Sequence, residues 1–188
     1  SVARRVKEYA PRWVGVPLGS WGAGAVVISL VAGYVACLAL NALLRERIGG
    51  AAAMWAVVLF ASGPLAALFQ VGYAETLFLF LLFLSILCVQ QRRWGWLYLL
   101  VPAMGFTRPG ILAFALFLGL YGIHRFLRRR REELSPRDVV HIVSLGALAT
   151  LVGFSWQWIA AAVTGDPGAY LATELAWRRN WLGGESGF

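Results

Sequence analysis

Long runs without charged residues constrain this chain more than any other feature of its sequence. The first run covers residues 21–44, and the last, over 139–164, has His141 as its one titratable residue. About 20 apolar residues are enough for a helix to cross the hydrocarbon core of a membrane. Because a helix satisfies its backbone hydrogen bonds within itself, such runs predict helices rather than open sheets in lipid.

Six apolar segments follow one another along the chain. They predict an all-α fold: a polytopic transmembrane helical bundle that forms a single transmembrane domain over residues 1–188. The composition supports this, because 14% of the residues are charged, against about 25% in ordinary soluble domains. The expected segments are 21–44, 51–71, 76–91, 94–107, 109–123 and 139–164, followed by an outer loop at 165–188.

Two interruptions stand out in this pattern. Gly63-Pro64 lies inside the second segment, where proline removes a helical hydrogen bond and kinks the helix. The segments 94–107 and 109–123 are short, so they either both span or form one re-entrant hairpin. Broken helices occur at membrane depth only beside protein or a water-filled cavity. The break at 107–110 is therefore a candidate cavity lining.

The basic residues predict the orientation of the chain. The net charge is +8, but the arginines lie at the ends of apolar runs, which favours a topological role over nucleic-acid binding. If all six segments span, ten of the 17 Lys and Arg residues fall on one side. That side is expected to be cytoplasmic. The other face then carries residues 70–76, the break at 107–110 and residues 165–188, while residues 1–13 are expected to lie along the interface.

Glu75 stands between two apolar segments, where a carboxylate is costly unless it is paired or hydrated. One interpretation is a substrate or metal-site residue, or a base. The other is a helix-start residue stabilised by the positive end of the helix dipole. The residues alone leave both open.

Arg108 is the one charged residue between Arg93 and Arg125. Its planar guanidinium suits phosphate or carboxylate, so Arg108 either recognises an anionic, lipid-linked donor or is a snorkelling interface arginine. Pro109 at a helix start and the break before it favour the first interpretation. The predicted topology also allows an ion pair between Arg108 and Glu75, because it places both residues on the same face.

The last stretch contains two further candidate features. Asp166 precedes Pro167, so it either opens a turn or contributes to a site. Trp177 and Arg178 combine an aromatic ring with a cation. They are interpreted either as part of an interfacial belt or as a site in which the ring stacks on sugar and the arginine holds phosphate.

Three short motifs together resemble those of PIG-V-like mannosyltransferases, the family of GPI mannosyltransferase II and its bacterial relatives. The first motif runs from Gly63-Pro64 through Tyr73-Ala74-Glu75-Thr76, and the second is Thr107-Arg108-Pro109-Gly110. The third is Gly165-Asp166-Pro167 followed by Trp177-Arg178. Their order and spacing match over roughly residues 21–179. The resemblance implies a membrane glycosyltransferase of the GT-C type.

The resemblance also implies roles for individual residues. Tyr73 and Glu75 would line the substrate site, Arg108 would meet the donor phosphate, and Asp166 and Trp177 would shape the acceptor loop. Two departures are evident: Ala74 and Thr76 replace the serines of the family motif. The family's acidic catalytic loop has no counterpart before Trp21, so the catalytic residue is expected upstream of Ser1, with further parts missing at both ends.

The expected activity is transfer of a sugar from a polyprenyl-phosphate donor to a glycolipid or glycan acceptor, and mannose is the sugar that the resemblance favours. The active face would be extracytoplasmic, in a multi-pass protein of a bacterial plasma membrane. The expected partners are membrane lipid, donor and acceptor, with no nucleic acid, no cofactor and no metal. The alternative is a non-catalytic multi-pass scaffold or transporter subunit.

Overall fold

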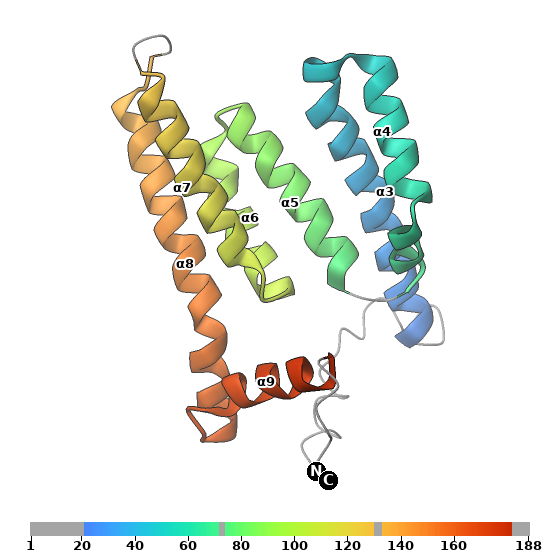
Figure 1. Ribbon diagram of the computed structural model, residues 1–188, viewed down its shortest axis with the longest axis vertical. Helices are drawn as coiled ribbons and strands as arrows, with labels where there is room; N and C mark the ends of the chain where they lie inside the picture. The colour runs from blue at the N-terminus through green and yellow to red at the C-terminus, as the bar shows by residue number, and fades with distance from the viewer. Residues whose placement is uncertain (1–20, 72–73, 130–132, 182–188) are drawn as a thin grey trace. The chain divides into compact units, whose positions relative to one another are not determined.

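The computed structural model describes residues 21–71, 74–129 and 133–181 of the chain (Figure 1). These ranges contain seven α-helices and one 3-10 helix, and no strand. The all-α prediction is therefore confirmed for the described part. The helices divide into two compact units, the first ending at Arg108 and the second beginning at Pro109.

In the first unit, the long helix α3 (Trp21–Ile48) packs against both α4 (Gly50–Ser62) and α5 (Ala74–Gln90). Helix α5 also packs against α6 (Trp94–Thr107). The chain reverses between α3 and α4 at Gly49, whose φ of 83° lies in the left-handed region that favours glycine. Antiparallel neighbours joined by short connections place α3, α4, α5 and α6 in one bundle (Figure 1).

The predicted interruption at Gly63-Pro64 ends helix α4. Gly63 has extended backbone angles, and the 3-10 helix η1 (Pro64–Gln70) follows it. A Cβ added at position 63 would lie 2.9 Å from the carbonyl oxygen of Leu59. Any residue other than glycine would therefore require a local shift of the backbone. The second apolar segment is thus a helix followed by a tight turn, and η1 packs back against α3 and α4.

In the second unit, α7 (Ile111–Leu127) and α8 (Pro136–Thr164) pack side by side, and α9 (Ala169–Trp181) packs on α8. The start of α8 is well defined, because the Ser135 hydroxyl accepts a hydrogen bond from the Arg137 N–H at 3.3 Å. Its end is equally clear: Gly165 adopts φ 75°, and its N–H donates to the Ala161 carbonyl.

An ion pair closes the α7–α8 hairpin near its connection. The Arg125 guanidinium lies 3.6 Å from the Asp138 carboxylate, and it donates a 2.8 Å hydrogen bond to the Glu133 carbonyl. The Arg125 and Asp138 side chains are only 9% and 10% exposed. A buried charge is tolerated when it is paired in this way.

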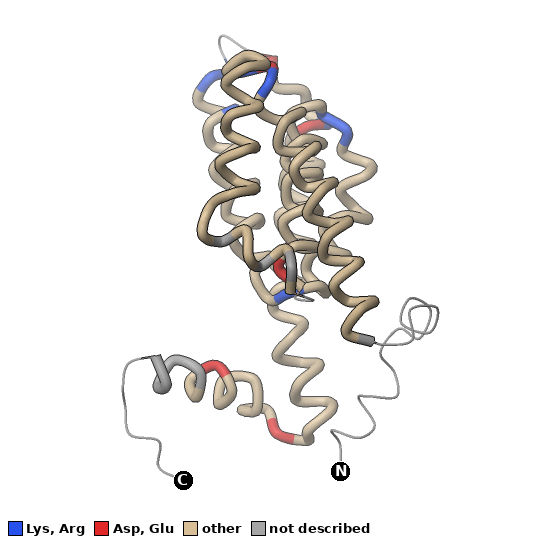
Figure 2. The backbone as a smooth tube through the Cα atoms, turned by 90° about the vertical axis from the view of Figure 1, so that its right-hand side faces the viewer, with Lys and Arg blue, Asp and Glu red and all other residues tan. Residues whose placement is uncertain are grey.

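Two helices in the described ranges are long and apolar enough to cross a membrane: Gly22–Ile48 and Pro136–Thr164. Helices α4, α5 and α7 are apolar but shorter. Large apolar side chains point outward from several helices, among them Trp55, Leu99, Leu116 and Val163. In the described helices before α9, charged residues gather at helix ends and connections, with long uncharged stretches between them (Figure 2).

The helix boundaries follow the apolar segments closely, with one correction. The segment 94–107 is α6 with the same bounds, whereas residues 169–181, expected to be loop, form the helix α9. The sequence from Ala169 to Ala176 is rich in Ala, Leu and Glu, which favour helix. The segment has no long apolar run of the kind that predicts the other helices.

Candidate functional site

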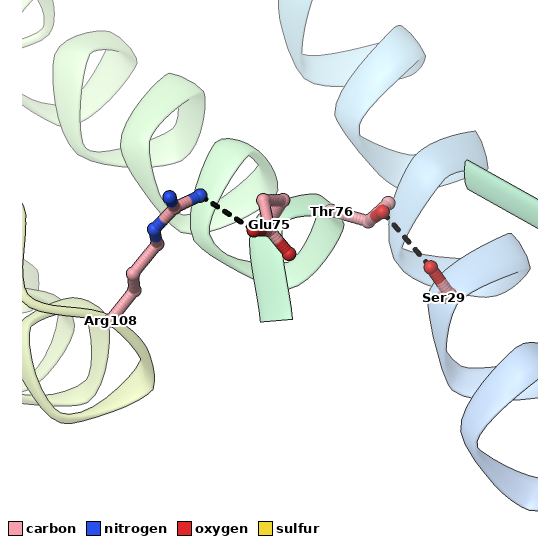
Figure 3. A network of polar contacts seen from close by, with 4 residues as sticks. All are labelled: Ser29, Glu75, Thr76 and Arg108. Atoms are coloured by element: carbon pink, nitrogen blue, oxygen red, sulfur yellow. Dashed lines mark hydrogen bonds and ion pairs between the residues drawn. The ribbon is translucent and has the colours of Figure 1, made fainter. Parts of the chain in front are cut away.

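The N-terminal turn of α5 brings the polar residues of the first unit together. Glu75 lies in the first turn of this helix, where the exposed N–H groups and the helix dipole favour a negative charge. Thr76 follows it and is completely buried. Figure 3 shows the two side chains pointing to opposite sides, with Glu75 directed at Arg108 and Thr76 at Ser29 of α3.

Arg108 pairs with Glu75 across 33 positions of sequence. The guanidinium Nη1 lies 2.8 Å from the Glu75 Oε1, within both hydrogen-bond and ion-pair distance (Figure 3). The pair that the topology made possible is therefore present in the structure. Arg108 is the last residue before Pro109 and has extended backbone angles, because a residue before proline disfavours the helical region.

The Glu75–Arg108 pair is accessible. The Arg108 side chain is 49% exposed and the Glu75 side chain 30% exposed. An ion pair with this exposure contributes at most about 1 kcal/mol to stability. Arginine carries five N–H donors in a planar fork, and the exposure of the Arg108 side chain leaves room for an anionic ligand.

A second polar contact fixes the start of α5 from the opposite side. The Ser29 hydroxyl donates a 2.9 Å hydrogen bond to the Thr76 hydroxyl, and both residues are buried. Gly33, one turn further along α3, lets the two helices approach, because a side chain there would lie 3.3 Å from the Thr76 methyl group. These contacts hold α5 against α3 at the residue next to Glu75.

A cavity of about 320 Å³ adjoins this turn in the first unit. Its walls come from the end of α4, from η1 and from the start of α5, and Glu75 is their ionisable residue. The aromatic rings of Phe60 and Phe69 lie 5.3 Å apart at one side of the cavity. The lining residues are Leu59, Phe60, Gly63, Pro64, Phe69, Glu75, Thr76 and Leu79. Such walls suit a hydrocarbon group whose polar end lies near Glu75.

The other predicted site residues belong to the second unit or lie outside the described structure. Tyr73 lies outside the described residues. Asp166 belongs to the second unit, where its Oδ1 accepts a 2.8 Å hydrogen bond from the Gly168 N–H, which is the turn-forming role. Trp177 and Arg178 are part of helix α9. Only Glu75 and Arg108 among the predicted residues are in contact with each other in the described structure.

Sequence reasoning missed the residues that support the site. Ser29 and Gly33 are small residues four positions apart in α3, a spacing that places them on one helix face. Small residues at this spacing are typical of close helix packing in membranes, and this was the available signal. Outside this site, in α9, burial raises the pKa of the Tyr170 hydroxyl, and the charge of Glu174 and a hydrogen bond to it add to the increase.

In the part of the chain that the structure describes, no group of three or more His, Cys, Asp or Glu residues is arranged to hold a metal ion. No protein-family model, no curated protein and no solved structure matches this chain. The family resemblance of the three motifs therefore stays a prediction.

Proposed function

We propose that this protein is a membrane glycosyltransferase that takes a sugar, with mannose as the favoured candidate, from a polyprenyl-phosphate donor. The acceptor would be a glycan or glycolipid at the extracytoplasmic face. The observation that carries the proposal is the half-exposed Glu75–Arg108 pair beside an apolar cavity. A polyprenyl-phosphate sugar needs both features, because its chain is apolar and its phosphate is anionic.

The membrane placement has support of its own. Two helices have the length and apolarity to cross a bilayer, and outward-facing apolar side chains on several helices are suited to lipid contact. In the six-span topology, the arginines at the ends of α3, α5 and α7 face the cytoplasm. Glu75 and Arg108 then lie at the opposite face.

Arg108 would bind and stabilise the donor phosphate. As the bond between the anomeric carbon and the phosphate oxygen breaks, negative charge develops on the leaving phosphate, and a positioned guanidinium stabilises it. Glu75 holds the guanidinium in place before the donor arrives, through the 2.8 Å contact. The phosphate would then take over part of this contact, so Glu75 acts as a positioning residue.

The acceptor hydroxyl forms the new bond to the anomeric carbon, and its proton must pass to a base. Among the described residues, Arg108 would serve donor binding and leaving-group stabilisation, and the family resemblance implies an acidic residue as the base for this step.

The test is transfer of radiolabelled mannose from polyprenyl-phosphate-mannose in membranes that contain the protein. Arg108→Ala should lower turnover by about 100-fold or more, in the range for losing one oxyanion donor. Glu75→Ala should also lower it strongly, and Arg108→Lys should restore part of the loss. Arg47→Ala is the matched control, because Arg47 is an exposed arginine at the end of α3.

Equal losses in the Arg108 and Arg47 variants would exclude the phosphate role. If the parent protein neither transfers mannose nor binds the donor, another lipid-linked sugar should be tested first. If no such donor binds, the result would support a scaffold or transporter subunit.

A further inference from the structure

The second unit contains an apolar groove that the proposed reaction does not use. It has a volume of about 450 Å³ and runs along the seam between α7 and α8. On α7 it is lined by Ala115, Gly119 and Phe126, and on α8 by Val143, Gly146 and Thr150. In each helix these positions fall on one face, because successive positions are three, four or seven residues apart.

The groove is open because two of its three lining glycines face empty space. A Cβ added at Gly119 or at Gly146 would meet nothing within 4 Å. At Gly122, by contrast, an added Cβ would lie 3.1 Å from the Ile142 side chain. The helices are therefore in contact at the floor of the groove, and Gly119 and Gly146 keep the space above it empty.

One end of the groove carries positive charge. Phe126 lines the groove, and the guanidinium carbon of Arg129 lies 4.0 Å from the centre of its ring. Arg128 and Arg137 are also exposed at this end of the hairpin, with Glu133 as an exposed acidic residue. Because Arg125 and Asp138 pair with each other, the exposed side chains give this end a positive surplus.

The length of the groove matches one leaflet of a bilayer. From Ala115 to Phe126 the helix rises about 16 Å at 1.5 Å per residue, roughly half of the hydrocarbon core of about 30 Å. A single acyl chain from one leaflet would lie along this groove, and its headgroup would meet the arginine end.

We infer that the α7–α8 groove binds an anionic phospholipid, with an acyl chain beside Gly119 and Gly146 and the phosphate headgroup at Arg129. In the proposed topology this lipid comes from the cytoplasmic leaflet, whose anionic lipids attract basic segments. The inference depends on the membrane placement of α7 and α8 and is independent of the transfer reaction.

The experiment measures lipid binding to the purified, delipidated chain in detergent by native mass spectrometry. Phosphatidylglycerol should bind about fivefold more tightly than phosphatidylcholine, as expected for one arginine near a headgroup. Arg129→Gln should remove this preference, whereas Arg47→Gln should keep it. Gly119→Leu and Gly146→Leu should each weaken binding of both lipids by about tenfold, because leucine fills the groove.

Gly95→Leu is the control for the glycine variants, since an added Cβ at Gly95 in α6 also meets nothing within 4 Å. Circular dichroism melts establish that each variant is folded, and a leucine that meets no neighbour favours helix over glycine. Should one glycine variant fail to fold, the other still tests the groove.

The inference would be overturned by equal binding of the two lipids or by displacement of the lipid by equimolar inorganic phosphate. Unchanged binding in a folded Gly119→Leu or Gly146→Leu variant would overturn it as well. A change in oligomeric mass without a change in bound lipid would also overturn it and would assign the groove to a second copy. Flotation of the chain with vesicles tests the membrane placement separately, and mannose transfer tests the reaction separately.

Discussion

The described part of each unit has an ion pair that joins neighbouring helices, and the two pairs Glu75–Arg108 and Arg125–Asp138 differ in what surrounds them. Glu75–Arg108 in the first unit lies at interrupted helices, beside a cavity, with side chains 30% and 49% exposed. Arg125–Asp138 in the second unit closes a continuous helical hairpin, with side chains 9% and 10% exposed. Solvent exposure decides how much of an ion pair's energy goes to folding. The first pair is suited to exchanging its partner for a ligand, and the second to holding two helices.

The largest expected effect is the loss of the buried pair. Asp138→Ala leaves the Arg125 charge buried without its carboxylate and should lower the free energy of unfolding by about 3 kcal/mol or more. Chemical unfolding in detergent, followed by circular dichroism, measures this. Glu46→Ala is the control, because Glu46 is exposed on α3.

The same pair offers a stricter test of its role. The double variant Arg125→Met with Asp138→Leu should recover most of the lost stability, because apolar side chains of similar volume replace both charges. If Asp138→Ala were as mild as Glu46→Ala, the contrast between the two pairs would be lost.

The second effect concerns close packing in the first unit. In Gly33→Leu the added Cβ alone would lie 3.3 Å from the Thr76 methyl group and 3.4 Å from the Phe69 ring. The whole leucine side chain overpacks this contact, which should cost about 1–3 kcal/mol. Gly22→Leu on the same helix should cost nothing, because an added Cβ there meets nothing within 4 Å. Thermal melts of the two variants in detergent compare them directly. Equal melting temperatures would show that α3 and α5 do not depend on this contact.

The third effect separates folding from function at the exposed pair. Glu75→Gln and Arg108→Gln should each change the free energy of unfolding by less than about 1 kcal/mol, and the coupling energy of their double-mutant cycle should be similarly small. Donor binding, under the proposed function, should fall strongly in Arg108→Gln. A coupling energy as large as that of a buried pair would instead assign Glu75–Arg108 to folding.

Most helix positions could be predicted from the sequence, because apolar runs and charged ends have local causes. Arg93 and Pro109 flank α6, and the bounds of this helix agree with prediction. Helix α9 was not predicted. Local propensity favoured the helix, but the apolar pattern that identified the other helices was absent.

The site was predictable only in part. The predicted topology made a Glu75–Arg108 pair possible by placing both charges on one face, and the structure contains the pair. The cavity beside Glu75 could not be predicted from the sequence, because it depends on where the 3-10 helix after Gly63 places Phe69. The Ser29–Thr76 contact joins residues 47 positions apart, and tertiary packing decides which hydroxyls meet.

The smallest expected effect belongs to α9 and concerns pH. The pKa of Tyr170 is raised above its ordinary value of 10.0, first by burial and then by the Glu174 carboxylate and its hydrogen bond. The folded state thus favours the neutral phenol. The contribution of the neutral Tyr170 hydroxyl to the free energy of unfolding is fully present below pH 10. It is lost as the pH rises through the raised pKa. An i,i+4 pair of this kind contributes about 0.2–0.5 kcal/mol.

Tyr170→Phe should therefore make the stability of the chain less sensitive to alkaline pH while changing it by only a few tenths of a kcal/mol at pH 7. Circular dichroism melts between pH 8 and 11.5 measure the difference, with Tyr98→Phe in α6 as the control. An unchanged alkaline slope in Tyr170→Phe would show that the Tyr170–Glu174 contact does not stabilise α9. The helix would then depend on its packing against α8 alone.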